Sequence, residues 1–358
     1  MRVLWINGNP NPNPGGTEAH SIDFINYLED VEDVLLYKVV AKGSYVDRYT
    51  SDKNKFYITL KSELSPLNSL KLIKLSISLK PDFVVGNNGN EYINTFLAGK
   101  LSGGKVILFR HMLNRLPLFL RKFILPNTYR VIAVSESSKR RLIEDGIPES
   151  KVKVIPNFID EKRFSTTWEE KEKKKEDLGI SKDVRVVSFL GKVAEGKGIY
   201  DFLEVARRLI KSKEKFFFMV IGYGKDLGKV REWIEENRLK EHLLLIGRVD
   251  SPEEYLKASD FLLVLSKGEE SFGRVVVEGF ACRNAVVVYD VENLKFLVEN
   301  GKTGFVCKVG DIECVVERLR ASGEAIKEIV ESGYKEFLSK YTKDIVLSQF
   351  VDTLKTQS

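Results

Sequence analysis

The chain has 358 residues, 43% of them hydrophobic and 30% charged, with a formal net charge of +6. This composition is typical of a soluble protein with room for two domains, and no apolar run is long enough to span a membrane. The modest positive charge is compatible with a polyanionic ligand or an anionic membrane surface, but the scattered lysines lack the basic-aromatic stripe of a nucleic-acid-binding protein.

In the first half of the chain, short apolar runs rich in β-branched residues alternate with polar or helical stretches. These runs predict strands at 2–7, 83–88, 105–111, 130–135 and 151–158. A loop after the first strand ends in Gly15 and Gly16, where a helix is expected to begin. Two glycines at a helix start let the backbone approach a phosphate, although an ordinary turn explains them too.

Two further features of the first half are candidates for function. His111 is one of only three histidines, and it stands at the carboxyl end of a predicted strand, where a structural role is the alternative. Segment 113–130 mixes leucine and phenylalanine with arginine and lysine. It is compatible with contact to an anionic membrane, but a helix that packs one face into the domain is favoured.

The second half repeats the alternation of strands and helices. Its strands are predicted at 184–191, 216–222, 242–248, 260–266 and 284–290. Strands this apolar are buried on both faces, which indicates parallel sheets covered by helices. We therefore expect an α/β protein with two doubly wound, Rossmann-like domains facing a cleft.

The expected domain limits follow from the charge pattern. The charge-dense segment 166–179 is interpreted as a solvated linker or helix near the boundary. The first domain is expected to cover 1–161 and the second 162–339, with a helix at 340–358 completing the first.

Glu270 and Glu278 lie eight residues apart and directly follow a predicted buried strand. Glu278 stands in an otherwise apolar helix start, where a carboxylate needs a partner. Sugar or ribose hydroxyls would serve, because one carboxylate can accept from two adjacent O–H groups. The alternatives are an ion pair between Glu278 and Arg274, four residues earlier, and an ordinary exposed loop position for Glu270.

Lys192 and Lys197 follow the first strand of the second half, in a glycine-containing loop before a helix. Two lysines and a helix N-terminus suit a diphosphate, although the spacing is not that of a Walker A motif and exposed turn lysines are the alternative. Three cysteines without metal-like spacing are interpreted as reduced and packed. They predict a cytoplasmic protein without a bound metal.

The order of these motifs resembles that of the retaining glycosyltransferases of family 4, which have the GT-B fold. The resemblance rests on GGTE (15–18), the histidine after KVILF, LGKVAEGKG (190–198) and the two-glutamate stretch. It implies a nucleotide-sugar donor such as a UDP-sugar or GDP-sugar, no cofactor, and an acceptor that can be a lipid, a glycan or a small molecule. Four positions depart from the family pattern, namely Lys192, Phe158, Arg283 and Ala285.

The resemblance also assigns roles to individual residues. Glu278 would hold the ribose, and Glu270 would contact the transferred sugar as one of the catalytic residues. Lys192 and Lys197 would neutralise the diphosphate in place of a metal ion. The backbone N–H groups near Phe272 and Gly273 would face the sugar.

The remaining assignments are spread over both halves. Arg248 and Val249 would lie near the base. Gly15 and Gly16 would approach the phosphate from the first domain, and His111 would be the second catalytic residue, facing the donor sugar. A weakly active nucleotide-sugar-binding subunit and a GT-B epimerase are the alternatives, whereas a nicotinamide-dependent dehydrogenase is disfavoured because no GxGxxG follows a strand.

Overall fold

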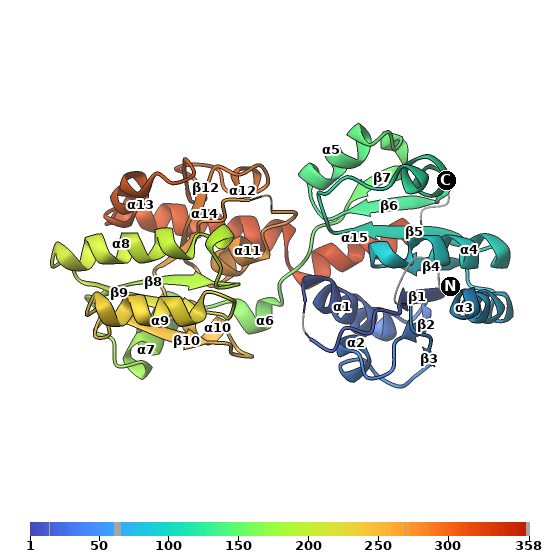
Figure 1. The fold of residues 1–358 in the computed structure, drawn as a ribbon, viewed down its shortest axis with the longest axis horizontal. Helices are drawn as coiled ribbons and strands as arrows, with labels where there is room; N and C mark the ends of the chain where they lie inside the picture. The colour runs from blue at the N-terminus through green and yellow to red at the C-terminus, as the bar shows by residue number, and fades with distance from the viewer. Residues whose placement is uncertain (14, 61–65, 269, 356–358) are drawn as a thin grey trace. The chain divides into compact units, whose positions relative to one another are not determined.

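The computed structural model describes residues 1–13, 15–60, 66–268 and 270–355 (Figure 1). The chain forms two compact units, Met1–Asn157 with Leu347–Ser358, and Phe158–Val346. Each unit is built on one sheet in which every described strand pair is parallel, with helices on both faces. This is the predicted doubly wound α/β architecture, found twice.

The sheet of the first unit has seven strands in the order β3-β2-β1-β4-β5-β6-β7. The strands are β1 (Arg2–Asn7), β2 (Leu35–Val40), β3 (Lys55–Tyr57), β4 (Phe83–Gly86), β5 (Lys105–Arg110), β6 (Arg130–Ala133) and β7 (Val152–Val154). The main helices are α1 (Gly16–Asp30), α2 (Tyr45–Arg48), α3 (Pro66–Leu79), α4 (Tyr92–Ser102) and α5 (Glu136–Glu144), with α15 (Lys343–Lys355) at the end of the chain. Short turns are η1 (Gly89–Glu91), the π-helical η2 (Leu120–Ile124), η3 (Leu125–Asn127) and η4 (Glu149–Lys151).

Aromatic rings fill one face of the first sheet. Trp5 of β1 lies 5.7 Å from Phe24 of α1 and 5.6 Å from Phe109 of β5, measured between ring centroids. Phe350 of α15 joins them, 5.5 Å from Phe109. Such large buried rings contribute much of the burial energy of a small core. On the other face, Leu120 of η2 is among the buried residues of 113–130, so one side of this segment packs inward, as favoured, while Phe119 and Phe123 on its other side stay exposed.

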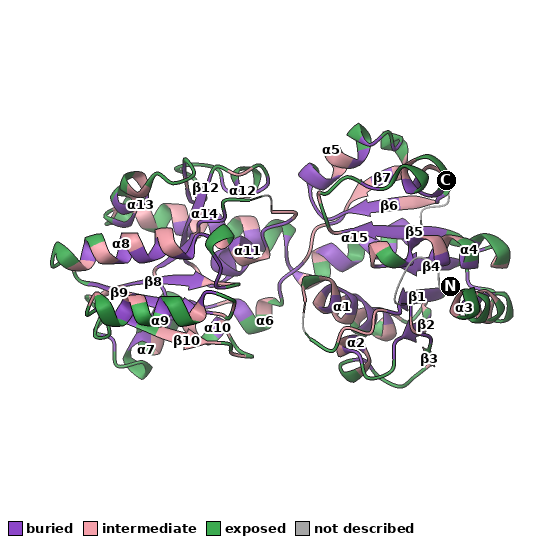
Figure 2. Ribbon diagram, in the orientation of Figure 1, coloured by how far each residue is buried: buried purple, intermediate pink, exposed green. Residues whose placement is uncertain are grey.

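The sheet of the second unit has six strands in the order β10-β9-β8-β11-β12-β13. They are β8 (Arg185–Leu190), β9 (Phe216–Ile221), β10 (Leu243–Gly247), β11 (Phe261–Val264), β12 (Ala285–Tyr289) and β13 (Phe305–Cys307). The helices are α6 (Glu161–Phe164), α7 (Trp168–Asp177), η5 (Glu195–Lys197), α8 (Ile199–Lys211), α9 (Leu227–Glu236), α10 (Glu253–Lys257), α11 (Arg274–Ala281), α12 (Leu294–Leu297), α13 (Ile312–Leu319) and α14 (Glu324–Lys340). Figure 2 shows the central strands buried and the outer faces of the helices exposed, which explains the apolar sequences of these strands.

Segment 166–179 is not the solvated linker that its charge density predicts. Its helix α7 packs on the second unit, and Lys171 is buried there, with its ammonium donating to the backbone carbonyls of Ser259 and Cys282. Burial lowers the pKa of Lys171 to about 8. The charged residues therefore fix the helix to its own unit, because backbone carbonyls satisfy a buried lysine head.

The prediction that all three cysteines are reduced is wrong for two of them. Cys307, at the end of β13, forms a disulfide with Cys314 in the first turn of α13. Cys282 is a buried free thiol, and burial raises its pKa. The argument for a cytoplasmic location loses this support, because disulfides are rare in most cytosolic proteins. Among the described residues, no helix is both long and apolar enough to cross a membrane.

Each sheet has a point where the strand order reverses direction. In the first sheet it lies between β1 and β4, and in the second between β8 and β11. Ligands of doubly wound sheets bind outside the carboxyl ends of the strands at such points. The loops that follow β1, β4, β8 and β11 are therefore where a functional site is expected.

Candidate functional site

The loop after β8 is shaped for close contact with a ligand. Gly198 has a φ of +78°, and a Cβ placed there would lie 2.0 Å from the carbonyl oxygen of Leu265 in the loop after β11. Glycine is therefore required for the two loops to pack together. Helix α8 begins at Ile199 without a side-chain cap. The N–H groups of its first turn therefore lack helical acceptors and can bind an anion.

An ion pair joins the two loops at the reversal point of the second sheet. The ammonium of Lys197 contacts Oε1 of Glu270, and the Ser266 hydroxyl donates to the same oxygen over 2.7 Å. The Lys197 side chain is 41% exposed, so its head remains accessible to a ligand. The sequence predicted both residues for one site, and the structure brings them into contact.

A pocket of about 360 Å³ opens beside this ion pair. It is lined by Lys192, Lys197 and Lys225, together with Ala194, Gly196, Ser266 and Gly268. Among the residues that the structure describes, no carboxylate lines the pocket, so the pocket favours an anion. Lys225 was missed from the sequence, although the turn GYG before it follows β9, the neighbouring strand. That turn packs on the β8 loop, where Val193 donates its backbone N–H to the carbonyl of Tyr223 over 2.8 Å.

A second network of polar contacts attaches the loop after β11 to helix α8 and strand β12. Lys267 pairs with Asp201 of α8 over 2.7 Å. The other oxygen of Asp201 accepts a hydrogen bond from the Tyr289 hydroxyl over 2.6 Å. The loop is thus fixed to α8 and β12 by residues that no local sequence pattern identifies.

Glu278 is buried in α11 with 7% of its surface exposed. It accepts from Nε of Arg274 over 3.0 Å, so the ion pair considered from the sequence does form. Burial raises the pKa of Glu278 above its ordinary value, and the positive charge of Arg274 opposes that rise. One partner at one oxygen does not saturate a carboxylate, which can accept up to four hydrogen bonds.

Phe272 and Gly273 form the turn into α11. Gly273 has a φ of +84°, and a Cβ there would meet Leu297 at 2.8 Å, so glycine fixes how the helix begins. Phe272 is buried, and its ring packs against Tyr341 with 6.0 Å between centroids. Helix α11 has no side-chain cap, which leaves its first N–H groups for a ligand.

Arg248 and Val249 follow β10, two strands from the reversal point. The guanidinium of Arg248 lies 5.2 Å from the ring centroid of Tyr223, which is 49% exposed. An exposed aromatic ring beside a planar cation offers stacking surfaces for a flat ring. Of the residues predicted in the second unit, Lys192 and Lys197 line the lysine pocket, whereas Arg248 and Val249 are not among its lining residues.

In the first unit, Gly15 and Gly16 start α1 after the loop of β1. A Cβ on Gly15 would meet the carboxylate of Glu18 at 2.4 Å, whereas Gly16 faces open space. Glu18 is buried and accepts from Nδ2 of Asn9 over 3.1 Å, so it holds the loop in place. The open side of Gly16 leaves room for a ligand to approach the helix start.

His111 is linked to the same helix through Asn87, which the sequence did not identify. The amide nitrogen of Asn87 donates to the carbonyl of Thr17 over 2.9 Å. This bond turns the amide oxygen of Asn87 toward Nε2 of His111, which lies 3.0 Å away. That oxygen only accepts, so Nε2 carries the proton. Burial, aided by the charge of Arg110, lowers the pKa of His111 to about 3. The imidazole is therefore neutral at physiological pH.

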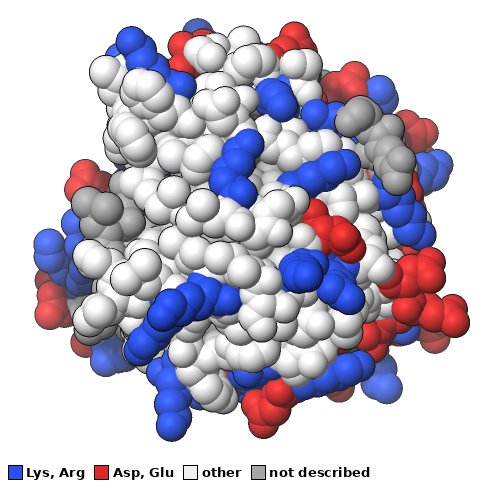
Figure 3. All heavy atoms as spheres, turned by 90° about the vertical axis from the view of Figure 1, so that its right-hand side faces the viewer, with Lys and Arg blue, Asp and Glu red and all other residues white. Residues whose placement is uncertain are grey.

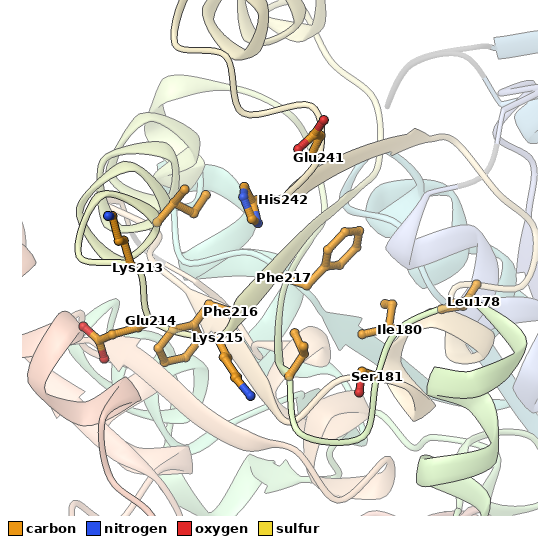
Figure 4. A pocket seen from close by; sticks show the side chains of 13 residues that line it. Leu178, Ile180, Ser181, Lys213, Glu214, Lys215, Phe216, Phe217, Glu241 and His242 are labelled. Carbon is orange, nitrogen blue, oxygen red and sulfur yellow. The ribbon is translucent and has the colours of Figure 1, made fainter.

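A second cavity, of about 500 Å³, lies at the opposite edge of the second sheet (Figure 4). Its lining comes from residues that precede β8, β9 and β10, including Ile180, Lys213 and His242. In Figure 4 the Phe217 ring of β9 and the side chain of His242, which directly precedes β10, both border this cavity. Parallel strands place their amino ends far from the loops that carry the lysines, so this cavity is separate from the candidate site.

Two family models match most of the chain. The model described as Glycosyltransferase Family 4 matches residues 14–163, and the model described as Glycosyl transferases group 1 matches residues 170–328. Every residue placed above at the lysine pocket falls in the second match.

Individual relatives are more distant. An N-acetyl-alpha-D-glucosaminyl L-malate synthase of Bacillus anthracis is 24% identical over 62% of this chain and 58% of its own length. The chain spans about three fifths of the length of this and two further curated glycosyltransferases. A UDP-Gal:alpha-D-GlcNAc-diphosphoundecaprenol alpha-1,3-galactosyltransferase of Escherichia coli is 23% identical over 87% of this chain and 85% of its own.

Among solved structures, Alr3699/HepE of Anabaena in complex with UDP has a TM-score of 0.86 and 18% identity, with 100% of both chains covered. The structure of the same protein with UDP-glucose has a TM-score of 0.81. At this identity the likeness shows the fold, which both chains share over their whole length.

Proposed function

We propose that this chain, which belongs to glycosyltransferase family 4, group 1, transfers a sugar from a nucleotide-sugar donor to an acceptor. The observation that carries this proposal is the Lys197–Glu270 ion pair at the reversal point of the second sheet, beside a pocket lined by three lysines. The pocket offers the positive charge that a diphosphate requires. Glu270 contacts one of its lysines and would lie beside the sugar that is attached to the diphosphate.

The chemistry of sugar transfer gives the lysines their role. When the glycosidic bond of the donor breaks, negative charge develops on the departing diphosphate. Lys192 and Lys225 make no ion pair with another described residue and are exposed, so both heads can turn to the phosphates. Lys197 is held by Glu270 until a ligand arrives. The three lysines and the start of α8 would together supply the stabilisation that other enzymes take from a metal ion.

The two glutamates would bind different parts of the donor. Glu278 keeps an oxygen for the ribose hydroxyls, and its burial strengthens each hydrogen bond by excluding water. Glu270 would accept from hydroxyls of the transferred sugar, while the N–H groups after Phe272 and Gly273 donate to the same sugar. The exposed Tyr223 and Arg248 offer a stacking surface for the base.

The first unit would contribute the acceptor and a second set of donor contacts. The open start of α1 at Gly16 suits a phosphate oxygen. The neutral imidazole of His111 donates from Nε2 to Asn87 and keeps Nδ1 as an acceptor for a sugar hydroxyl. A neutral acceptor suits this task because a charged imidazolium would repel a developing positive charge on the sugar.

Three finer points belong to the proposal. The bound UDP and UDP-glucose in the Anabaena structures support a uridine diphosphate sugar as donor. The name of the Escherichia coli relative supports a lipid-linked acceptor as the first class to test. Family membership supports retention of anomeric configuration, by attack on the face that the diphosphate leaves, and the coupling constant of the product's anomeric proton tests this.

The experiment that tests the proposal compares the wild type with Glu270→Gln. We expect release of nucleoside diphosphate from a sugar donor, faster with an acceptor present, and a loss of at least about 100-fold in Glu270→Gln. Donor binding without turnover would instead favour a partner subunit. A new sugar nucleotide formed from donor alone would favour an epimerase, and equal rates in both proteins would refute the role of Glu270.

A further inference from the structure

The outward face of α3 is apolar where a surface helix is usually polar. Leu67, Leu70 and Ile77 are exposed by 77%, 55% and 48%. The exposed Lys71 and Lys74 lie between these three residues in the sequence. The five positions are separated mainly by three, four or seven residues, which is the helical spacing, so all five lie along one stripe of the helix. The buried face of α3 is a different one. The exposed stripe is therefore not needed for the core of the unit.

Two neighbouring elements extend this surface. Helix α3 packs along α4, where the Ser76 hydroxyl donates to that of Ser102 over 3.1 Å, and η2 packs beside α4. The exposed apolar side chains of the combined face are 39% to 77% exposed, namely Leu67, Leu70, Ile77, Leu97, Leu101, Phe119 and Phe123. Exposed apolar side chains gathered on neighbouring packed elements are typical of an interaction site. We call it the α3–α4 face.

The charges on the α3–α4 face have one sign. Its exposed charged side chains are Lys71, Lys74, Lys80, Lys100, Lys105 and Lys122. None of these lysines forms an ion pair with another residue that the structure describes. In the described part of 66–105, Asp82 is the one exposed carboxylate, and it directly precedes β4, where it accepts from the backbone N–H of Arg2 over 2.7 Å. Glu91 is buried.

A basic pocket borders the same face. It has a volume of about 350 Å³ and is lined by Lys100, Lys105 and Lys151, together with Gly103, Tyr129 and other residues where β5 and β6 begin. Figure 3 shows the side of the molecule that carries α3 and α4, with a broad uncharged area crossed by lysine and arginine side chains and the acidic ones mainly toward its edges. A pocket with three lysines suits a phosphate group.

We propose that the α3–α4 face docks on an anionic membrane surface, with its leucine and phenylalanine side chains in the interface and its lysines among lipid phosphates. Burial of apolar side chains and attraction of lysines to anionic lipid act together in such docking. A second copy of this chain does not fit, because it would bring the same unpaired lysines against one another. The proposal is independent of the transferase activity.

The test measures how the full-length protein partitions onto sedimented vesicles. We expect binding to vesicles that mix phosphatidylcholine with phosphatidylglycerol, weaker binding at high salt, and little binding to phosphatidylcholine alone. Lys71→Gln with Lys74→Gln should lower the partition coefficient by about 30-fold, since each lysine near an anionic surface contributes about fivefold. Leu67→Gln with Leu70→Gln should also lower it.

Matched controls come from the second unit. Leu244 is 42% exposed, and Lys211 is exposed without an ion pair to a described residue, so Leu244→Gln and Lys211→Gln change the same chemistry elsewhere. Both should bind vesicles like the wild type. Binding to neutral vesicles that is as strong as binding to anionic vesicles would overturn the proposal. So would a loss of binding in the control variants as large as the loss in the variants of the α3–α4 face. Binding to soluble polyglutamate without binding to vesicles would overturn it in favour of an acidic protein partner.

A second measurement does not depend on loss of binding. Leu70→Trp places a reporter at a half-exposed position where a larger side chain meets no core residue. Its emission should shift to the blue when anionic vesicles are added, beyond any shift of the wild type. An unchanged spectrum with vesicles bound would show that another face makes the contact and would overturn the proposal.

Discussion

Replacing Glu278 with glutamine separates a functional carboxylate from a structural one. The amide has the same shape, but it has no charge and presents one acceptor oxygen instead of two. With both ribose hydroxyls on the carboxylate, the change removes about one charge-assisted hydrogen bond, worth about 1.5 to 3 kcal/mol. We therefore expect Glu278→Gln to weaken donor binding by about 10- to 150-fold.

The same change should leave the fold almost unaffected. Arg274, the hydrogen-bonded partner of Glu278, has 33% of its side chain exposed and can turn to solvent. Removing a buried charge also removes the desolvation cost that raises the pKa of Glu278. The free energy of unfolding should change by less than about 1 kcal/mol. Binding and stability thus respond differently to one substitution.

The assay is calorimetric titration with UDP and UDP-glucose, paired with thermal unfolding. Glu253 is the matched control, because it is also buried and its carboxylate pairs with Arg163 over 2.6 Å. Glu253→Gln should likewise change the free energy of unfolding by less than about 1 kcal/mol, because the Arg163 side chain is 45% exposed and can turn to solvent, and it should leave donor affinity unchanged. Donor affinity of the wild type should also fall as pH is lowered through the raised pKa of Glu278, and Glu278→Gln should lose that dependence. Unchanged affinity with lower stability in Glu278→Gln would refute the reasoning.

Three further results are expected. Lys197→Ala and Lys225→Ala should each weaken UDP binding about tenfold, which calorimetric titration checks. EDTA should not change activity, which release of nucleoside diphosphate with and without the chelator checks. Burial raises the pKa of Glu91 to about 8, so the folded state prefers the protonated form. Stability should therefore fall by about 2 to 4 kcal/mol as pH rises from about 4.5 to 8, and denaturation of Glu91→Gln should show no such fall. Reducing the Cys307–Cys314 bond should lower the free energy of unfolding by about 2 to 3 kcal/mol, measured with and without dithiothreitol, and an unchanged midpoint would contradict this.

The strands of both sheets were predictable where apolar runs are uninterrupted. The predicted runs at 2–7, 105–111 and 216–222 match β1, β5 and β9 to within a residue. Strand β2 was missed, because its sequence LLYKVV carries Lys38 in the middle. Lys38 is buried there and pairs with Glu29 of α1, a partner that lies outside any local pattern. Tertiary pairing thus hides a strand from periodicity.

The candidate site was partly readable for a topological reason. Lys197 and Glu270 each follow an apolar strand, which suggests a common edge, but their contact depends on β8 and β11 being neighbours. Strand order is not encoded in periodicity. Lys225 and Asn87 were missed because neither stands in a motif, and only the packing of their loops brings them to the site.

One departure from the family pattern has a structural explanation. Arg283 adopts a φ of +49°, pairs with Glu331 over 2.9 Å and lies 3.6 Å from the ring centroid of Tyr334. It therefore ties the end of α11 to α14. The substitution serves packing of the second unit and spares both glutamates.

The most direct test of the donor site is release of nucleoside diphosphate from a panel of UDP-, GDP- and ADP-sugars. The proposed function predicts that donors of one nucleoside, expected to be uridine, release their diphosphate, and that Lys197→Ala and Glu270→Gln suppress the release at unchanged stability. No release from any donor, or release at the same rate in both variants, would contradict it.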